Sequence, residues 1–404
     1  MKRTIGNLDK RNRAEKRFKF FGAFSILAAM AFLLVLISMV VSKGKGAAFR
    51  SEIALEIDLK KYQEISQIDF RKVIKKALKQ RFPEARSIAD INSLYQLMSN
   101  IAYLELRDKL ESKPELIGHK STLHLSASSK ADMFFKGNPN AGVNDLQKFW
   151  LEGIKENKEY RRVINWKFFK FADSREPEIA GIGAGLVGSF MTMLVFLILA
   201  FPIAVMCAFY LEEFAPKNYL TDIIEVSINN LAAIPSIIYG LLGLTLYLQF
   251  MHLPRSSSLV GGATLFMLVL PVIIIASRNT IRSIPISVRE GAMALGASKM
   301  QLVLHHLLPY SIPGIMTGTI LAVSRALGET APLLMIGMVA FIADIPKKLT
   351  DPTTALPVQI YLWSDAPEAG FAEKTSLAII ILLFFLILLN LSAIIIRKKF
   401  EKKW

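Results

Sequence analysis

Residues 375–396 read TSLAIIILLFFLILLNLSAIII, without a single Asp, Glu, Lys or Arg. The stretches Val226–Phe250 and Leu259–Ser277 are equally free of these four residue types. An uncharged apolar stretch of about twenty residues is long enough to cross a bilayer core of about 30 Å. The sequence therefore predicts a membrane protein, and a soluble enzyme, a disordered protein and a disulfide scaffold are poor interpretations of it. Cys207 is the only cysteine, so an intrachain disulfide is impossible.

Six stretches of the 404-residue chain are apolar enough to be membrane spans. They lie at 20–41, 181–211, 226–250, 259–277, 311–342 and 376–396. The first follows a basic flank, as a secretion signal does, but its length exceeds the usual signal core of about 7–15 residues. We therefore expect an uncleaved first helix and a membrane all-α fold, a bundle of six transmembrane helices.

The basic residues are distributed unevenly along the chain, which has a formal net charge of +16, and both of its ends are basic. Eight Lys and Arg residues lie at or before Lys19, and the tail 397–404 holds five more, namely Arg397, Lys398, Lys399, Lys402 and Lys403. Short cytoplasmic flanks are enriched in Lys and Arg. We therefore expect a multi-pass protein with both termini and the basic loop 278–310 in the cytoplasm, and with the loop 344–374 outside. Membrane-facing charge does not imply nucleic-acid binding.

Between the first two spans lies a segment, 42–178, that is long enough to form a domain. Apolar residues alternate with polar ones from Ile53 to Leu59, the pattern of a half-buried strand. Similar alternation occurs at 123–127 and, less cleanly, at 163–167. Helical spacing occurs near 69–82, 87–112 and 144–160. We expect a small extracytoplasmic α+β domain here.

Gly183, Gly185 and Gly188 match GxGxxG, a pattern that in a soluble protein suggests a dinucleotide site. No expected strand directly precedes them, and they open an uncharged span. Gly181 and Gly185 also have the spacing that lets membrane helices approach closely, so helix packing is the preferred interpretation. The chain has no GxxxxGK[ST] phosphate loop. We expect no cofactor, and ATP-driven movement would need a nucleotide site on another chain.

The loop 278–310 is far longer than a usual helix connection of about 2–8 residues. Ser287-Val-Arg-Glu290 reads as a capping box, in which the serine caps a helix and the glutamate reaches back to its amide. Gly296 can end that helix in the left-handed conformation. Ser298-Lys-Met-Gln301 is a second capping box, and Pro309 would close the second helix. The alternatives are a compact cytoplasmic knob of two short helices and a solvated loop with incidental caps.

Arg325 and Glu329 are the only charged residues of the fifth expected span, and their i,i+4 spacing puts them on one helix face. Each would cost about 2.5–3.5 kcal/mol if it faced lipid near the midplane. Counting from Ser311 at about 1.5 Å per residue places Arg325 roughly 21 Å from the cytoplasmic start. A guanidinium there can hold phosphate through paired hydrogen bonds. A structural ion pair is the alternative, so pathway and structure both stay open.

One motif of the long loop resembles a known family. Glu290-Gly-Ala-Met-Ala-Leu-Gly296, then nine residues, then His306-Leu-Leu-Pro309 is similar to the coupling loop of ABC importer permeases. Two positions depart from the family pattern: Gly291 replaces an alanine and His306 an isoleucine. The glycine weakens its helix by about 1 kcal/mol. The resemblance implies that this loop docks on an ATPase subunit through Ser287, Glu290, Gly291, Ala292, Gly296 and Pro309. Adjacent His305 and His306 point to different faces, so no metal site is expected.

A narrower resemblance, to PstA-type permeases of phosphate importers, runs from about 181 to the end of the chain. It rests on four segments: Asn229–Gly240, Leu270–Ile274, Thr317–Pro332 and Leu356–Tyr361. It implies a permease core at 179–396 with the substrate pathway at Arg325, Glu329 and Thr330. It also implies a second permease subunit in a heterodimer, a pair of ATPase subunits and an extracytoplasmic phosphate-binding protein, all at the bacterial inner (cytoplasmic) membrane. The segment 42–178 resembles an insertion that some members carry.

The resulting hypothesis is the membrane permease subunit of an ATP-driven phosphate importer, which is a transporter subunit and not an enzyme. The same core could serve another oxyanion of the sulfate or molybdate type, because one arginine accepts several tetrahedral anions. A rival of another class is a membrane sensor that uses the 42–178 domain. Such a sensor needs only two spans, and it leaves four further spans and the charges Arg325 and Glu329 without a role.

Overall fold

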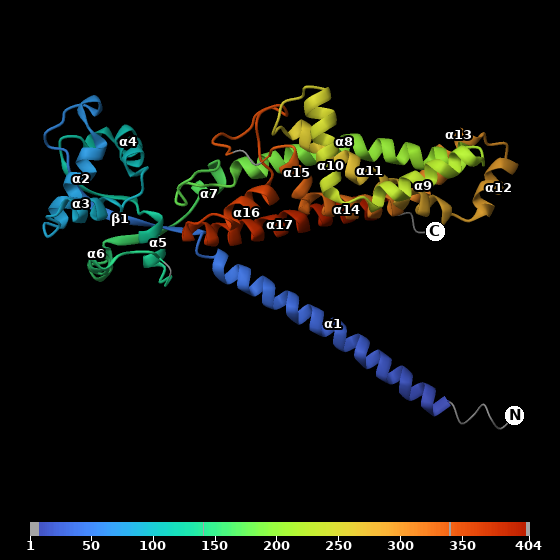
Figure 1. The fold of residues 1–404 in the computed structure, drawn as a ribbon, viewed down its shortest axis with the longest axis horizontal. Helices are drawn as coiled ribbons and strands as arrows, with labels where there is room; N and C mark the ends of the chain where they lie inside the picture. Colours follow the sequence, from blue (N-terminus) through green and yellow to red (C-terminus); the bar gives the residue numbers. More distant parts are fainter. Residues whose placement is uncertain (1–7, 140, 339–340, 401–404) are drawn as a thin grey trace.

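The computed structural model describes residues 8–139, 141–338 and 341–400. The predictions for the outermost basic residues, Lys2, Arg3, Lys402 and Lys403, lie outside the described residues. Figure 1 shows three parts: the 42–178 segment at one end, an elongated helical bundle, and the helix α1 (Leu8–Gly44), which leaves the bundle at an angle.

The bundle confirms the predicted membrane all-α class. Its helices are α8 (Gly183–Phe209) with the π-helical turn η4 (Tyr210–Phe214), α9 (Tyr219–Ala233), α10 (Ser236–Gly243) with η5 (Leu244–Phe250), α11 (Ser258–Arg282), α12 (Ile286–Ala294), α13 (Lys299–Gln301) with η6 (Leu302–Leu307), α14 (Leu308–Gly328), α15 (Ala331–Met335), α16 (Leu356–Ser364) and α17 (Ala369–Phe400). Within the described residues, five helices are long and apolar enough to cross a membrane, or six if the bent pair α9–α10 counts as one span.

The third expected span, 226–250, is not one straight helix. It is broken between Ala233 and Ser236, where α9 and α10 meet at 101°. Pro235 accounts for the break, because proline has no N–H to donate to the helix and its ring clashes with the preceding turn. The Tyr239 hydroxyl donates to the Leu231 carbonyl at 2.7 Å. This bond satisfies one of the backbone oxygens that the break releases.

The fifth expected span, 311–342, is wrong at both ends. One helix runs continuously from Lys299 to Gly328, and the chain then leaves the helical conformation at Glu329. Pro332 explains the end, because a proline at i+4 clashes with the carbonyl of residue i, here Gly328. A short helix, α15, begins after this break.

The glycines of α8 pack closely against the segment that leads into α16, which supports the helix-packing interpretation over a dinucleotide site. A Cβ at Gly188 would overlap the Thr354 carbonyl oxygen, and one at Gly185 would overlap the Gln359 side chain. Gln359 is fully buried and its amide donates to the Gly181 carbonyl at 2.9 Å. Only glycine allows these backbones to lie so close.

The 42–178 segment contains the expected small α+β fold. Its antiparallel sheet has the order β2-β1-β3, and its helices pack around it (Figure 1). The elements are β1 (Phe49–Asp58), η2 (Ile65–Gln67), α2 (Phe70–Arg81), α3 (Ile88–Tyr95), α4 (Ala102–Ser112), η3 (Pro114–Leu116), β2 (Lys120–Ser126), α5 (Ser129–Phe135), α6 (Asp145–Glu156), β3 (Tyr160–Ile164) and α7 (Lys167–Lys170).

The strand expected from Ile53 to Leu59 is confirmed, since the four apolar side chains of that alternation are buried. The third strand, expected at 163–167, lies at Tyr160–Ile164, and it ends before residue 167 because Trp166 already caps α7. The helical stretch near 87–112 is interrupted: α3 and α4 are separated by residues 96–101, where Met98 makes a β-bridge to Ala127.

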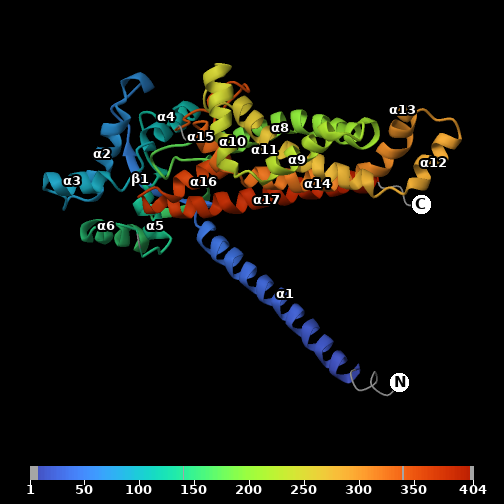
Figure 2. The same cartoon turned by 45° about the vertical axis from the view of Figure 1, so that its right-hand side comes forward.

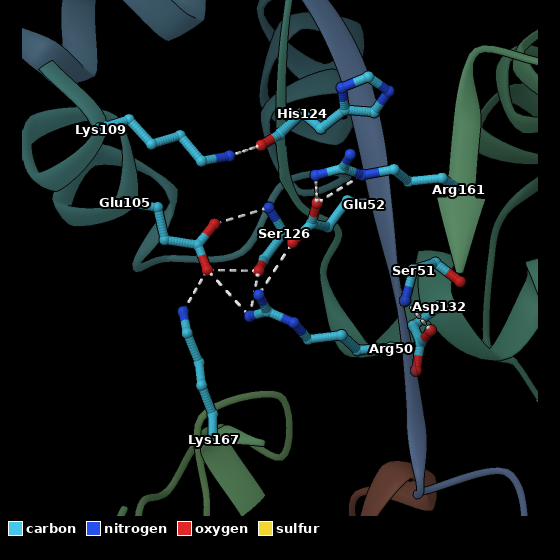
Figure 3. A network of polar contacts seen from close by, with 10 residues as sticks. All are labelled: Arg50, Ser51, Glu52, Glu105, Lys109, His124, Ser126, Asp132, Arg161 and Lys167. Carbon is cyan, nitrogen blue, oxygen red and sulfur yellow. Dashed lines mark hydrogen bonds and ion pairs between the residues drawn. The ribbon is translucent and has the colours of Figure 1, made fainter. Parts of the chain in front are cut away.

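A buried polar network ties the sheet to the helices around it (Figure 3). Arg50 of β1 bridges two buried carboxylates, Glu52 at 2.8 Å and Glu105 of α4 at 3.1 Å. Arg161 of β3 pairs with Glu52 at 2.8 Å, and Lys167 pairs with Glu105. Three cations thus surround two carboxylates, which is how proteins stabilise charges away from water.

Contacts at the start of α17 hold the 42–178 segment to the bundle. Lys136, which follows α5, pairs with Glu373 at 3.2 Å, and the Asn138 amide donates to the same carboxylate at 3.4 Å. A Cβ at Gly370 would overlap the Ser129 hydroxyl, so α17 and α5 touch directly. Figures 1 and 2 both show α5 beside the end of α17.

Candidate functional site

A knob formed by the short helix α12 and by α13, residues 283–301, stands at the end of the bundle far from the 42–178 segment (Figures 1 and 2). The expected capping box at its start is wrong. α12 begins at Ile286 behind Pro285, so Ser287 lies inside the first turn and its side chain makes no cap bond. Only three residues separate α11 from α12, and the Pro285 carbonyl already accepts from the Val288 amide. The helix therefore starts before Ser287 can serve as its cap.

The end of α12 is as the sequence predicts. Gly296 has φ +86°, and its amide donates to the Met293 carbonyl at 2.9 Å, while the Ala297 amide reaches Ala292 at 3.1 Å. This pair of bonds is the Schellman motif, for which glycine in the left-handed region is the usual residue. The second capping box is also confirmed, because the side chains of Ser298 and Gln301 each accept from the other's amide.

Pro309 does not close the second helix. The π-helical turn η6 joins α13 to α14, and Pro309 lies at the first turn of α14 inside one continuous helix from Lys299 to Gly328. The wider ladder of a π turn leaves room for a residue without an N–H, and a proline in a first helical turn removes no obligatory bond. The knob therefore passes directly into a membrane-length helix.

The knob exposes several large apolar side chains. Its large exposed side chains are Ile286 at 68%, Met293 at 50%, Leu295 at 91% and Met300 at 59%. Exposed apolar groups that cluster on one surface mark an interaction site. Glu290 is exposed there and makes no ion pair with any described residue. Its predicted bond back to an amide is absent, because the helix does not begin where that bond requires.

The next two residues of the motif, Gly291 and Ala292, differ in exposure. Gly291 is exposed and an added Cβ would meet nothing within 4 Å, so no close contact requires glycine there. Ala292 is buried in a cluster with Phe209, Ile281 and Leu302 that fixes the knob to the bundle. Ala292 therefore packs inward, and a partner would meet Glu290 and Gly291.

An arginine that the sequence did not single out anchors α12. Arg289 pairs with Glu213 of η4 at 3.0 Å and donates to the carbonyls of Ile281 and Ile284 at 2.9 and 2.7 Å. It thus binds one carbonyl in the last turn of α11 and one in the connection between α11 and α12. No local signal predicts this contact, because the two charged residues are 76 positions apart.

A second network lies beside it. The buried Arg278 of α11 pairs with Glu212 at 2.6 Å and with Glu225 of α9, and Arg282 reaches Glu212 at 2.9 Å. These charges join η4, α9 and α11 at the base of the knob. Glu212 and Glu213 therefore neutralise the arginines closest to the predicted coupling motif.

The other candidate residues lie at the break after α14. Arg325 Nε is 3.5 Å from Glu329 Oε1, so the structure brings the two charges together. Glu329 is the C-cap residue of α14 and has left the helical conformation. Thr330 is the N-cap residue of α15, and its hydroxyl lies 3.5 Å from the Gly328 carbonyl oxygen. The Arg325 side chain is 49% exposed and that of Glu329 is 18% exposed. The pair therefore opens onto the surface of this single chain.

Two of the sequence segments that carry the family resemblance meet at this break. Gly240 of α10 packs on α15, where its Cβ would lie 2.7 Å from the Cα of Pro332 and 2.8 Å from the Cβ of Met335. Broken helices at membrane depth occur where the backbone is buried in protein or lines a water-filled cavity. Both breaks, at Pro235 and at Glu329, lie on elements that contact each other through these residues.

Nothing in the described part of the chain forms a group of three or more His, Cys, Asp or Glu side chains that could hold a metal ion. His305 and His306 are both exposed in η6.

Comparison with known proteins gives two family matches and several relatives. Residues 179–404 match the family described as the binding-protein-dependent transport system inner membrane component, and residues 6–144 match DUF3333, a domain of unknown function. The phosphate transport system permease protein PstA of Yersinia pestis is 30% identical over 254 residues, which cover 62% of this chain and 85% of the relative. The probable ABC transporter permease protein YqgH of Bacillus subtilis is 28% identical over 267 residues, covering 64% and 84%.

A solved inward-facing structure of the MetNI methionine ABC transporter is similar over 55% of this chain and 98% of that chain, at 17% identity and a TM-score of 0.44. The family match covers more than half of the 404 residues, and it includes both the knob and the broken helices described above. This chain belongs to the family of inner membrane components of binding-protein-dependent transport systems.

Proposed function

We propose that this chain is the membrane permease subunit of an ATP-driven phosphate importer, in which it forms part of the anion path and couples it to separate ATPase subunits. The observation that carries the proposal is the knob. It presents Glu290 and an exposed apolar surface beyond the membrane-length helices. The phosphate permease named among the relatives supports phosphate as the substrate.

The proposed partners follow from the exposed surfaces. An ATPase subunit would bind the knob through Glu290, Leu295 and neighbouring apolar side chains. A second permease subunit would cover Arg325 and the polar residues Asn229 and Asn230 of α9, which are exposed in this chain, because such groups are costly in contact with lipid. An extracytoplasmic binding protein would deliver the anion. On this proposal both termini lie in the cytoplasm of a bacterium, and the chain crosses its inner membrane.

Arg325 and Glu329 act together in the proposed path. With the path empty, Glu329 neutralises the arginine at 3.5 Å. An arriving phosphate would replace that carboxylate at the guanidinium through charge-assisted hydrogen bonds, and the free N–H groups of the fork give it two parallel contacts. Thr330 adds a hydroxyl one residue beyond Glu329, next to the helix break.

The test is uptake of radiolabelled phosphate in cells that depend on this transporter. We expect Glu290→Lys to abolish uptake while the protein remains in the membrane, and Glu84→Lys, at an exposed glutamate of the 42–178 segment, to leave uptake unchanged. Normal uptake by Glu290→Lys would contradict the coupling role.

Arg325→Gln should likewise abolish uptake without loss of the membrane-inserted protein. Unchanged uptake would leave only a structural role for the Arg325–Glu329 pair. Substrate identity is tested in the unmodified protein: a hundredfold excess of sulfate or molybdate should not reduce phosphate uptake, and competition by either would favour the broader oxyanion permease.

A further inference from the structure

A basic cleft of about 630 Å³ lies where the end of α1 meets the 42–178 segment and the start of α17. Four basic side chains and one acidic side chain line it: Lys43, Lys45, Lys136, Arg162 and Glu373. The cleft shares no lining residue with the knob or with the Arg325–Glu329 pair. We propose that it is a binding site for a phosphate group.

Most of its positive charge is uncompensated. Lys136 is paired with Asp132 and Glu373, so these two carboxylates are occupied by the lysine that they face. Lys43, Lys45 and Arg162 have no ion-pair partner among the residues that the structure describes. Three cations that converge on one hollow from α1, from the turn after it and from β3 attract a multiply charged anion.

Arg162 is held in a defined position. One of its Nη atoms donates to the Phe135 carbonyl, which fixes the guanidinium at the wall of the cleft. A guanidinium has five N–H donors in a planar fork, so the donors that do not face Phe135 are available to a ligand. This geometry suits an oxyanion with several acceptor oxygens, and phosphate matches the fork better than a single carbonyl does.

The level of the cleft is set by α1. Its apolar stretch ends at Val41, and Lys43 and Lys45 follow within four residues, so they lie at the membrane surface where lipid phosphates are found. In the proposed topology this is the non-cytoplasmic side, where the charge rule does not favour Lys and Arg. The charge rule for membrane orientation therefore gives no reason for lysines at these two positions, whereas binding of a phosphate group would.

The same phosphate chemistry could come from a lipid headgroup or from a free anion, and the structure favours the lipid. The Cβ that Gly44 lacks would lie 2.8 Å from Ile380 Cδ1, so α1 and α17 touch beside the cleft. Below that contact α1 diverges from the bundle (Figures 1 and 2), and apolar side chains of both helices are exposed, among them Met39 and Phe384. Acyl chains would lie against these exposed apolar side chains while the headgroup phosphate occupies the basic cleft.

The experiment uses the full chain purified in neutral detergent and native mass spectrometry. The probes are short-chain phosphatidylglycerol, phosphatidylcholine with the same acyl chains, and, in a separate calorimetric titration, inorganic phosphate. The test variant is Lys43→Gln/Lys45→Gln/Arg162→Gln. Its matched control, Lys60→Gln/Lys61→Gln/Lys79→Gln, removes the same charge from exposed lysines of the 42–178 segment that make no ion pairs with described residues.

We expect phosphatidylglycerol to bind the unmodified protein and the control, and to bind the triple cleft variant at least tenfold more weakly. Binding of inorganic phosphate with the same dependence on the three residues, without lipid binding, would support the site and name the free anion as its source. Equal binding of both lipids by all variants, or no binding of any probe, would overturn the proposal. Lys43→Gln/Lys45→Gln keeps the Arg162–Phe135 bond, and it should weaken binding without any effect on folding.

Discussion

The clearest mechanical prediction concerns Arg289, the side chain that fastens α12 to the bundle. Arg289→Met removes the ion pair to Glu213 and the bonds to the Ile281 and Ile284 carbonyls. The side chains of Arg289 and Glu213 are only 19% and 11% exposed, so Glu213 would remain nearly buried without a partner. Breaking a buried pair costs about 3–5 kcal/mol. Because both groups keep some contact with solvent, we expect about 2–3 kcal/mol for detachment of α12.

Hydrogen–deuterium exchange of the peptide 286–296 measures this directly in the purified full chain. At about 1.4 kcal/mol per factor of ten, exchange should become roughly 30- to 150-fold faster, with no change in α8 or α11. Arg282→Gln is the matched control, because Arg282 is 53% exposed and shares Glu212 with Arg278; we expect less than a tenfold effect. Unchanged exchange in Arg289→Met would refute the anchoring role.

Three further predictions follow from single positions. Gly188→Ala should prevent stable assembly of the bundle, because its Cβ would overlap the Thr354 carbonyl oxygen; Gly328→Ala, where nothing lies within 4 Å, is the control. A normal yield of monodisperse Gly188→Ala protein would disprove the close packing. Gly291→Ala should slow exchange of α12 roughly fivefold, since the position is open and alanine favours a helix by about 1 kcal/mol; faster exchange would mean that glycine is required there. Burial disfavours the charged form of Glu105, but Lys167 and hydrogen bonds from Ser126 outweigh it and hold its pKa below the ordinary 4.5. The stability that Glu105 contributes is therefore full above pH 4.5 and lost as pH falls through the lowered pKa; exchange of β1 should accelerate over that acidic range in the wild type and not in Glu105→Gln.

Local signals predicted the parts of this structure that depend on neighbours in sequence. The Schellman end at Gly296 and the capping box at Ser298 each involve residues within five positions. The buried alternation from Ile53 to Leu59 and the uncharged spans are likewise readable from short windows. These features are accessible because the forces that make them, backbone capping and burial of one face, act over a turn of helix or a few residues of strand.

The errors arose where one signal competed with another. Ser287 has the right spacing for a cap, but Pro285 starts the helix first. Pro309 suggests a helix end, whereas the π turn before it accommodates the proline. Pro332, four residues after Gly328, indicates the helix end at Gly328, but the apolar composition of 329–342 favoured a longer span, 311–342. The ion pair Arg289–Glu213 could not be predicted from the sequence, because only the packed bundle brings these two residues together.

The continuous helix through Pro309 supports the proposed mechanism. Had that proline ended the second helix, the knob and the Arg325–Glu329 pair would be joined by a flexible segment, and a displacement of one would be lost before it reached the other. Instead one helix extends from Lys299 at the knob to Gly328. At about 1.5 Å per residue, roughly 39 Å separate Lys299 from Arg325. A helix transmits an axial shift along its length because its backbone hydrogen bonds resist compression, and it ends at Glu329, where the backbone changes conformation. In the proposed mechanism, closure of the ATPase subunits against Glu290 therefore moves Arg325, which is on this helix, relative to Glu329, which follows the end of the helix.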